Sequence, residues 1–98
     1  RPANRFVAEF LGIANFVPLD GDRTGLVRPE RVRLAEDGGR PARVVEAIYL
    51  GQMVRYHVAL EGGEAATMVA AVPFVGRAFA PGERVTVSWD AADVWPVS

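Results

Sequence analysis

The chain of 98 residues predicts a small all-β domain, with roughly six to eight short strands behind one short N-terminal helix. Three observations support this fold class. Short segments alternate apolar and polar residues with a period of two, as half-buried strands do. Ten glycines and seven prolines divide these segments at short intervals. Half of the residues are apolar, which is enough for a packed core at this length.

The first element is a helix predicted over residues 4–11, within the segment NRFVAEFLG. Asn4 is a favourable N-cap because its side chain accepts hydrogen bonds from backbone amides one turn further on. Gly12 is a typical residue at which a helix ends. One face of this helix is apolar and consists of Phe6, Val7, Phe10 and Leu11. Because about two turns are too short to be stable alone, we expect this face to pack against the following strands or a preceding domain.

Strands follow in chain order, each bounded by glycine, proline or aspartate. The segment ANFVPLDGDRTGLV indicates two strands joined by a turn at residues 20–22. The segment RVRLAEDGGRPARVVEAIYLG indicates a short strand, a loop over residues 37–41 and a longer strand. A turn at residues 62–63 precedes the strand AATMVAAV. The segment ADVWPV indicates a short closing strand, in which Pro96 must lie at an edge or an end.

Two segments show the clearest alternation and therefore predict which residues face the core. In MVRYHVAL the apolar face consists of Val54, Tyr56, Val58 and Leu60, and the opposite face of Arg55 and His57. In ERVTVSWD the apolar face consists of Val85, Val87 and Trp89. Because closure of the sheet would remove exposed strand edges, the predicted fold of residues 13–98 is an OB-like β-barrel.

The composition argues against catalysis and against several kinds of ligand. Eleven cationic residues and twelve carboxylates give a formal charge of −1, without the basic excess of a nucleic-acid-binding domain. The sequence has no cysteine and no lysine, which excludes disulfides, thiolate metal sites and a Walker-type phosphate loop. The single histidine, His57, lies on a polar strand face, and the only serines are Ser88 and Ser98. We therefore expect no catalytic residue, metal or cofactor in this chain, and no nucleic-acid partner.

The segment GLVRPERVRL, residues 25–34, combines strand-forming residues with concentrated charge. Pro29 cannot donate a hydrogen bond to a neighbouring strand and favours an extended Arg28, which indicates a corner between two strands. Arginines also hold phosphate or carboxylate groups by forked hydrogen bonds. The candidate anion or partner contact consists of Arg28, Glu30, Arg31 and Arg33. A structural corner and a solvated charged face are the alternative interpretations.

Four short motifs occur in an order that resembles the TOBE domain, the transport-associated OB-type barrel at the C-terminus of ATPase subunits of bacterial ABC importers. These motifs are RPANRFVAEFLG at the start, VRPE at residues 27–30, YLG at residues 49–51 and GERVTVSW at residues 82–89. The resemblance extends over essentially the whole chain. It is strongest to the branch that imports polyamines, ferric ions, sugar phosphates and maltose.

The resemblance implies a domain organisation. Residues 1–12 would form the junction helix from a preceding ATPase domain, and residues 13–98 would form the TOBE barrel. The contacts of this junction would be Phe6, Val7, Phe10 and Leu11. The preceding domain would bind ATP and Mg²⁺, and this chain would be non-catalytic.

The resemblance also implies a regulatory and dimer-stabilising role. The expected partners are the ATPase domain, a second copy of the chain in a homodimer, the membrane subunits of the importer, and a regulatory protein or small ligand. The expected location is the cytoplasmic face of the bacterial inner membrane, reached through the transporter complex.

The alternative function is a free-standing barrel that binds a small oxyanion, such as molybdate or sulfate. Its ligands would be Arg28, Arg31 and Arg33. Related oxyanion pockets use backbone amides together with serine, threonine and lysine side chains. Two serines and no lysine count against this alternative.

Overall fold

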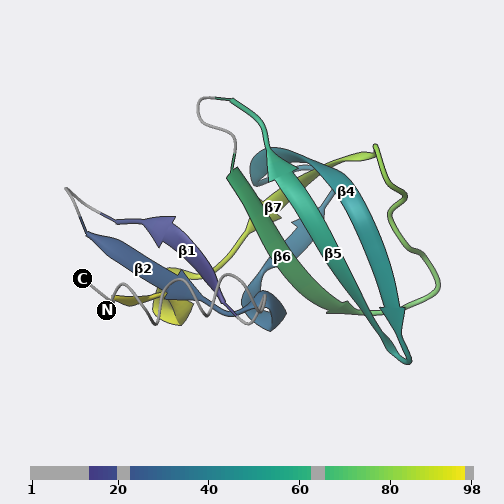
Figure 1. The fold of residues 1–98 in the computed structure, drawn as a ribbon, viewed down its shortest axis with the longest axis horizontal. Coiled ribbons are helices and arrows are strands. Elements are labelled where there is room, and N and C mark those ends of the chain that lie inside the picture. The colour runs from purple at the N-terminus through teal and green to yellow at the C-terminus, as the bar shows by residue number, and fades with distance from the viewer. Residues whose placement is uncertain (1–13, 20–22, 63–65, 97–98) are drawn as a thin grey trace.

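The structure is a computed structural model that describes residues 14–19, 23–62 and 66–96 (Figure 1). Its strands are β1 (Asn15–Pro18), β2 (Thr24–Val27), β3 (Arg33–Ala35), β4 (Arg40–Leu50), β5 (Met53–Leu60), β6 (Ala66–Pro73), β7 (Arg84–Ser88) and β8 (Trp95–Pro96). Two 3-10 turns, η1 (Pro29–Arg31) and η2 (Ala91–Asp93), are the helical elements of these ranges. The predicted all-β fold class is therefore confirmed. The helix predicted over residues 4–11 lies outside the described residues.

The strands form two antiparallel sheets. A three-stranded sheet has the order β1–β2–β8, and a five-stranded sheet has the order β3–β7–β4–β5–β6 (Figure 1). The chain passes from the first sheet to the second at η1 and returns to it at η2. Both ends of the described chain thus belong to the three-stranded sheet.

The prediction of a closed barrel is wrong, because the sheets do not close. The five-stranded sheet ends at β3 and β6, which contact each other but form no strand pair in the described ranges. The turn η1 packs against β6 and begins at buried Pro29, which lacks the N–H that a further strand pair would use. The architecture is consistent with an OB-like fold whose sheets remain open between β3 and β6.

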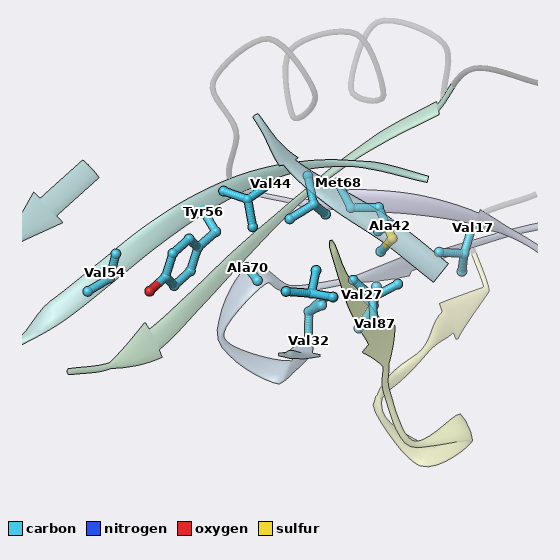
Figure 2. Packing of buried hydrophobic residues seen from close by; sticks show 12 residues of the cluster. Val17, Val27, Val32, Ala42, Val44, Val54, Tyr56, Met68, Ala70 and Val87 are labelled. Carbon is cyan, nitrogen blue, oxygen red and sulfur yellow. The ribbon is translucent and has the colours of Figure 1, made fainter. Parts of the chain in front are cut away.

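The core lies on the inward faces of both sheets and is built mainly from valine (Figure 2). Its members are Val17, Val27, Val32, Ala42, Val44, Val54, Tyr56, Val58, Met68, Ala70, Val85 and Val87. The faces predicted for β5 and β7 are confirmed, with Leu60 and Trp89 as half-buried neighbours of this cluster. β-Branched side chains fit the pleated surface of a sheet well, so a small core of this composition packs with little loss of rotamer freedom.

A β-bulge changes the direction of β4. Val44 pairs with Val58, whereas Glu46 pairs with His57, so Val45 is an extra residue in β4. The pairing of β4 with β7 ends just before the bulge, at Arg43. Beyond it, β4 pairs only with β5, which remains paired with β6 on its other side (Figure 1).

Candidate functional site

The segment around Pro29 is a structural corner. Arg28 is extended, with φ −77° and ψ 149°. The amide of Arg31 donates to the carbonyl of Arg28 at 2.9 Å, and the amide of Val32 to that of Pro29 at 3.2 Å. This turn carries the chain from β2 of the three-stranded sheet to β3 of the five-stranded sheet. The corner was the structural alternative that the sequence left open.

Two of the candidate arginines pair with carboxylates near η2. Arg33 Nη2 donates to Asp90 Oδ1 at 3.0 Å, and Arg31 Nε lies 3.9 Å from Asp93 Oδ1. The hydrogen bond from Arg33, together with its charge, holds the pKa of the Asp90 carboxyl below its ordinary value. The same contacts raise the pKa of Arg33. Because both partners of the Arg33–Asp90 pair are exposed, the pair adds little stability.

The four candidate residues therefore do not converge on one point. Arg31 and Arg33 are directed at two different carboxylates, and Arg28 and Glu30 are exposed. The two ion pairs connect η1 and the start of β3 with η2 and the residue before it. Partner or ligand contact by these residues stays a prediction.

A second charged cluster was missed in the sequence. Arg43 on β4 and Arg84 on β7 are direct cross-strand neighbours, and Glu61 binds both. Its Oε2 lies 3.6 Å from Arg43 Nε, and its Oε1 accepts from Arg84 Nη2 at 3.1 Å. The carboxylate between the two guanidinium groups offsets their repulsion. No pattern in the sequence indicates this cluster, because its members are far apart along the chain.

The loop between β6 and β7, residues 74–83, is fixed to the core through Tyr56. The amide of Phe79 donates to the Tyr56 hydroxyl at 3.0 Å, and the two rings meet edge to face at 5.8 Å. Arg77 lies over the Phe79 ring and forms ion pairs with Glu36 and Glu83, at 3.2 and 2.8 Å. The buried tyrosine thus has its polar atom satisfied by the loop that covers it.

Exposed apolar side chains gather where the β4–β5 hairpin meets the start of this loop. Tyr49, Leu50, Phe74 and Val75 are 61%, 55%, 47% and 84% exposed. The rings of Tyr49 and Phe74 are 6.4 Å apart, and the Phe74 amide donates to the Gln52 carbonyl at 2.8 Å. We call these four side chains the hairpin end. Contiguous exposed apolar surface marks interaction sites, so the hairpin end is the best candidate contact surface.

A hollow of about 530 Å³ lies beside the three-stranded sheet. Its lining residues are Pro18, Leu19, Arg23, Ala91, Val94 and Pro96, and none of the four candidate residues is among them. No group of histidine or carboxylate side chains in the described ranges could hold a metal ion. No helix within those ranges has the length and apolarity needed to cross a membrane.

The described residues form a small all-β domain with an OB-like arrangement of its two sheets. The family model of the TOBE domain matches residues 25–97. The chain belongs to the TOBE domain family, as the four sequence motifs indicated.

The relatives of the chain are ATP-binding proteins of importers. It is 36% identical to the spermidine/putrescine import ATP-binding protein PotA of Ruegeria pomeroyi, over 90% of this chain and 32% of the relative. It is 38% identical to the Fe(3+) ions import ATP-binding protein FbpC of Streptomyces coelicolor, over 96% of this chain and 32% of the relative. The chain thus spans about a third of the length of these relatives. No solved structure matches it.

Proposed function

We propose that the chain is the C-terminal domain of the ATP-binding subunit of a bacterial ABC solute importer, in which it stabilises the subunit dimer and serves regulation. The single observation behind this proposal is the TOBE match over residues 25–97. The similarity to 32% of the length of PotA and of FbpC agrees with one domain of a longer subunit. ATP and Mg²⁺ belong to a preceding ATPase domain, and this domain is non-catalytic. Through the membrane subunits the assembly lies at the cytoplasmic face of the inner membrane.

The hairpin end is the surface that we assign to contact with a second copy. At roughly 100 Å² for each of its exposed side chains, it offers on the order of 400 Å² of apolar surface. A stand-alone interface requires about 800 Å² from each partner. Tethering through paired ATPase domains raises the effective concentration to the millimolar range, so a weak contact suffices in the complete subunit.

The test of the dimer-stabilising role compares the complete subunit with a version that lacks residues 13–98. Sedimentation velocity without ATP measures the dimer fraction of each. We expect the complete subunit to retain more dimer than the truncated one. Equal dimer fractions across the concentration range would overturn this role.

The position of the contact is tested by disulfide cross-linking. The chain has no cysteine, so Leu50→Cys introduces a unique thiol at the hairpin end once any cysteines elsewhere in the subunit are replaced. Glu30→Cys, on the exposed surface of η1, is the matched control. We expect oxidation to link two subunits through position 50 and not through position 30. A dimeric subunit that fails to cross-link at position 50 would place the contact elsewhere.

A further inference from the structure

The outer face of the three-stranded sheet carries an apolar row that crosses all three strands. Phe16 of β1 pairs with Leu26 of β2, and Leu26 pairs with Trp95 of β8. Their chain neighbours Val17 and Val27 are buried in the core. Since successive side chains of a strand point to opposite faces, the row of Phe16, Leu26 and Trp95 faces away from that core.

This row is unusual for such a small sheet. Antiparallel sheets generally place polar residues on the face that is turned away from the core, but here an aromatic, an aliphatic and a second aromatic side chain stand in line. Phe16 and Leu26 are half-buried, whereas Trp95, on the edge strand, is 69% exposed. A segment that docks on this face therefore has to lie over Phe16 and Leu26, with Trp95 at one side of it.

The length of chain before β1 identifies the covering segment. Residues 4–11 contain the apolar set Phe6, Val7, Phe10 and Leu11, whose spacing is that of one face of a helix. Five residue steps separate Leu11 from Phe16, so the two α-carbons lie no more than about 18 Å apart. The inner face of the sheet is filled by the core. The outer face carries the apolar row of Phe16, Leu26 and Trp95 within the reach of this short connection.

We propose that residues 4–11 dock in cis on the outer face of the three-stranded sheet, with their apolar side chains over Phe16 and Leu26 and beside Trp95. The three-stranded sheet is then the part of the domain that holds the junction to a preceding domain, at a distance from the hairpin end. The docking itself does not depend on the proposed function. Its meaning as a junction to an ATPase domain rests on that function.

A spin label tests the docking in the complete chain. Because the chain has no cysteine, Glu9→Cys gives a unique labelling position next to Phe10 but outside the apolar set. Labelled, ¹⁵N-enriched chain is diluted into excess unlabelled chain of natural isotope content, so that only contacts within one chain broaden the signals. We expect broadening of the Leu26 amide and of the Trp95 indole N–H, and none at Tyr49 of the hairpin end.

Two further outcomes decide the proposal. The same label in a Phe10→Ser chain should lose most of the broadening at Leu26, because the segment has lost an apolar contact. Absence of broadening at Leu26 and Trp95 in the diluted wild-type sample would overturn the docking. Broadening that occurs only without dilution would show that a second copy covers the row, and would overturn docking in cis. Each result concerns this chain alone and leaves the proposed importer function to its own test.

Discussion

The side chain of Asn15 forms two hydrogen bonds with the backbone of Val69. Its Nδ2 donates to the Val69 carbonyl at 2.8 Å, and its Oδ1 accepts from the Val69 amide at 2.8 Å. Val69 lies in β6, an edge strand of the five-stranded sheet. The amide side chain therefore replaces the backbone of a missing neighbouring strand. It also joins the two sheets across 54 residues of sequence.

Replacement of Asn15 by alanine should destabilise the domain by about 2–3 kcal/mol, because it leaves a backbone donor and acceptor without partners. Urea unfolding measures the change in free energy, and amide exchange of Val69 should accelerate in the same variant. Thr67→Ala, at an exposed position of the same strand, is the control and should stay within about 0.5 kcal/mol. An Asn15→Ala domain as stable as this control would contradict the role of the pair.

Replacement of Tyr56 by phenylalanine should loosen the β6–β7 loop and keep the core packed. The hydroxyl that accepts from the Phe79 amide is lost, at a cost of about 1 kcal/mol, but the ring contact remains. Hydrogen exchange should speed up at Phe79 more than at the core strands. Tyr49→Phe serves as the control, because Tyr49 is exposed. Unchanged exchange at Phe79 would show that the hydroxyl does not hold the loop.

Replacement of Gly25 by alanine should destabilise the three-stranded sheet by about 1–3 kcal/mol through overpacking. A β-carbon at this position would overlap Cγ1 of Val94 and crowd Leu19. Shortening the obstructing side chain should remove most of the penalty. The measurement is a double-mutant cycle with Val94→Ala in urea, and strictly additive effects would exclude the overlap as the cause.

The Arg33–Asp90 pair should give Asp90 an NMR titration midpoint below the ordinary aspartate range. The pKa of Asp90 is lower in the folded than in the unfolded chain. The pair therefore stabilises the fold at pH values above the pKa of Asp90 in the unfolded chain, and this contribution is lost as the pH falls through its pKa in the folded chain. Arg33→Gln should raise the midpoint, and added salt should raise that of the wild type. Identical midpoints in wild type and variant would mean that the pair does not form in solution.

The arginines near Pro29 should not form an oxyanion site, because Arg31 and Arg33 already face Asp93 and Asp90. We expect the thermal unfolding midpoint in molybdate, tungstate, sulfate or phosphate to equal the midpoint in chloride at the same ionic strength. Specific binding at a hundredfold excess over the dissociation constant would add about 2.7 kcal/mol of stability. A shift of that size with one oxyanion would restore the alternative of a free-standing binding barrel.

The local parts of the fold were predictable from the sequence. The faces of β5 and β7 follow from a strict period of two, and Tyr56 is buried as its position in that pattern indicated. The corner follows from Pro29, whose fixed φ and missing N–H act within a few residues. These features depend on chain neighbours, which the sequence shows directly.

The parts that were missed depend on contacts between distant residues. The prediction of a closed barrel was wrong because η1 packs against β6. No local sequence pattern shows where a turn will pack. Asn15 has an ordinary sequence context, although asparagine is depleted in strands and so signals a special partner. Leu50 and Phe74 are of the same residue types as Leu60 and Phe79, which pack against the core. The hairpin end is exposed because β4 bulges after Val44 and its pairing with β7 ends at Arg43.

The most direct test of the account is the size of the native protein that contains this chain. An antibody raised against the chain is used on membrane and soluble fractions of the source cells after labelling with an ATP photoprobe. We predict a membrane-associated band several hundred residues long that carries the label. A soluble, unlabelled band near the length of this chain would contradict the assignment to an importer ATP-binding subunit.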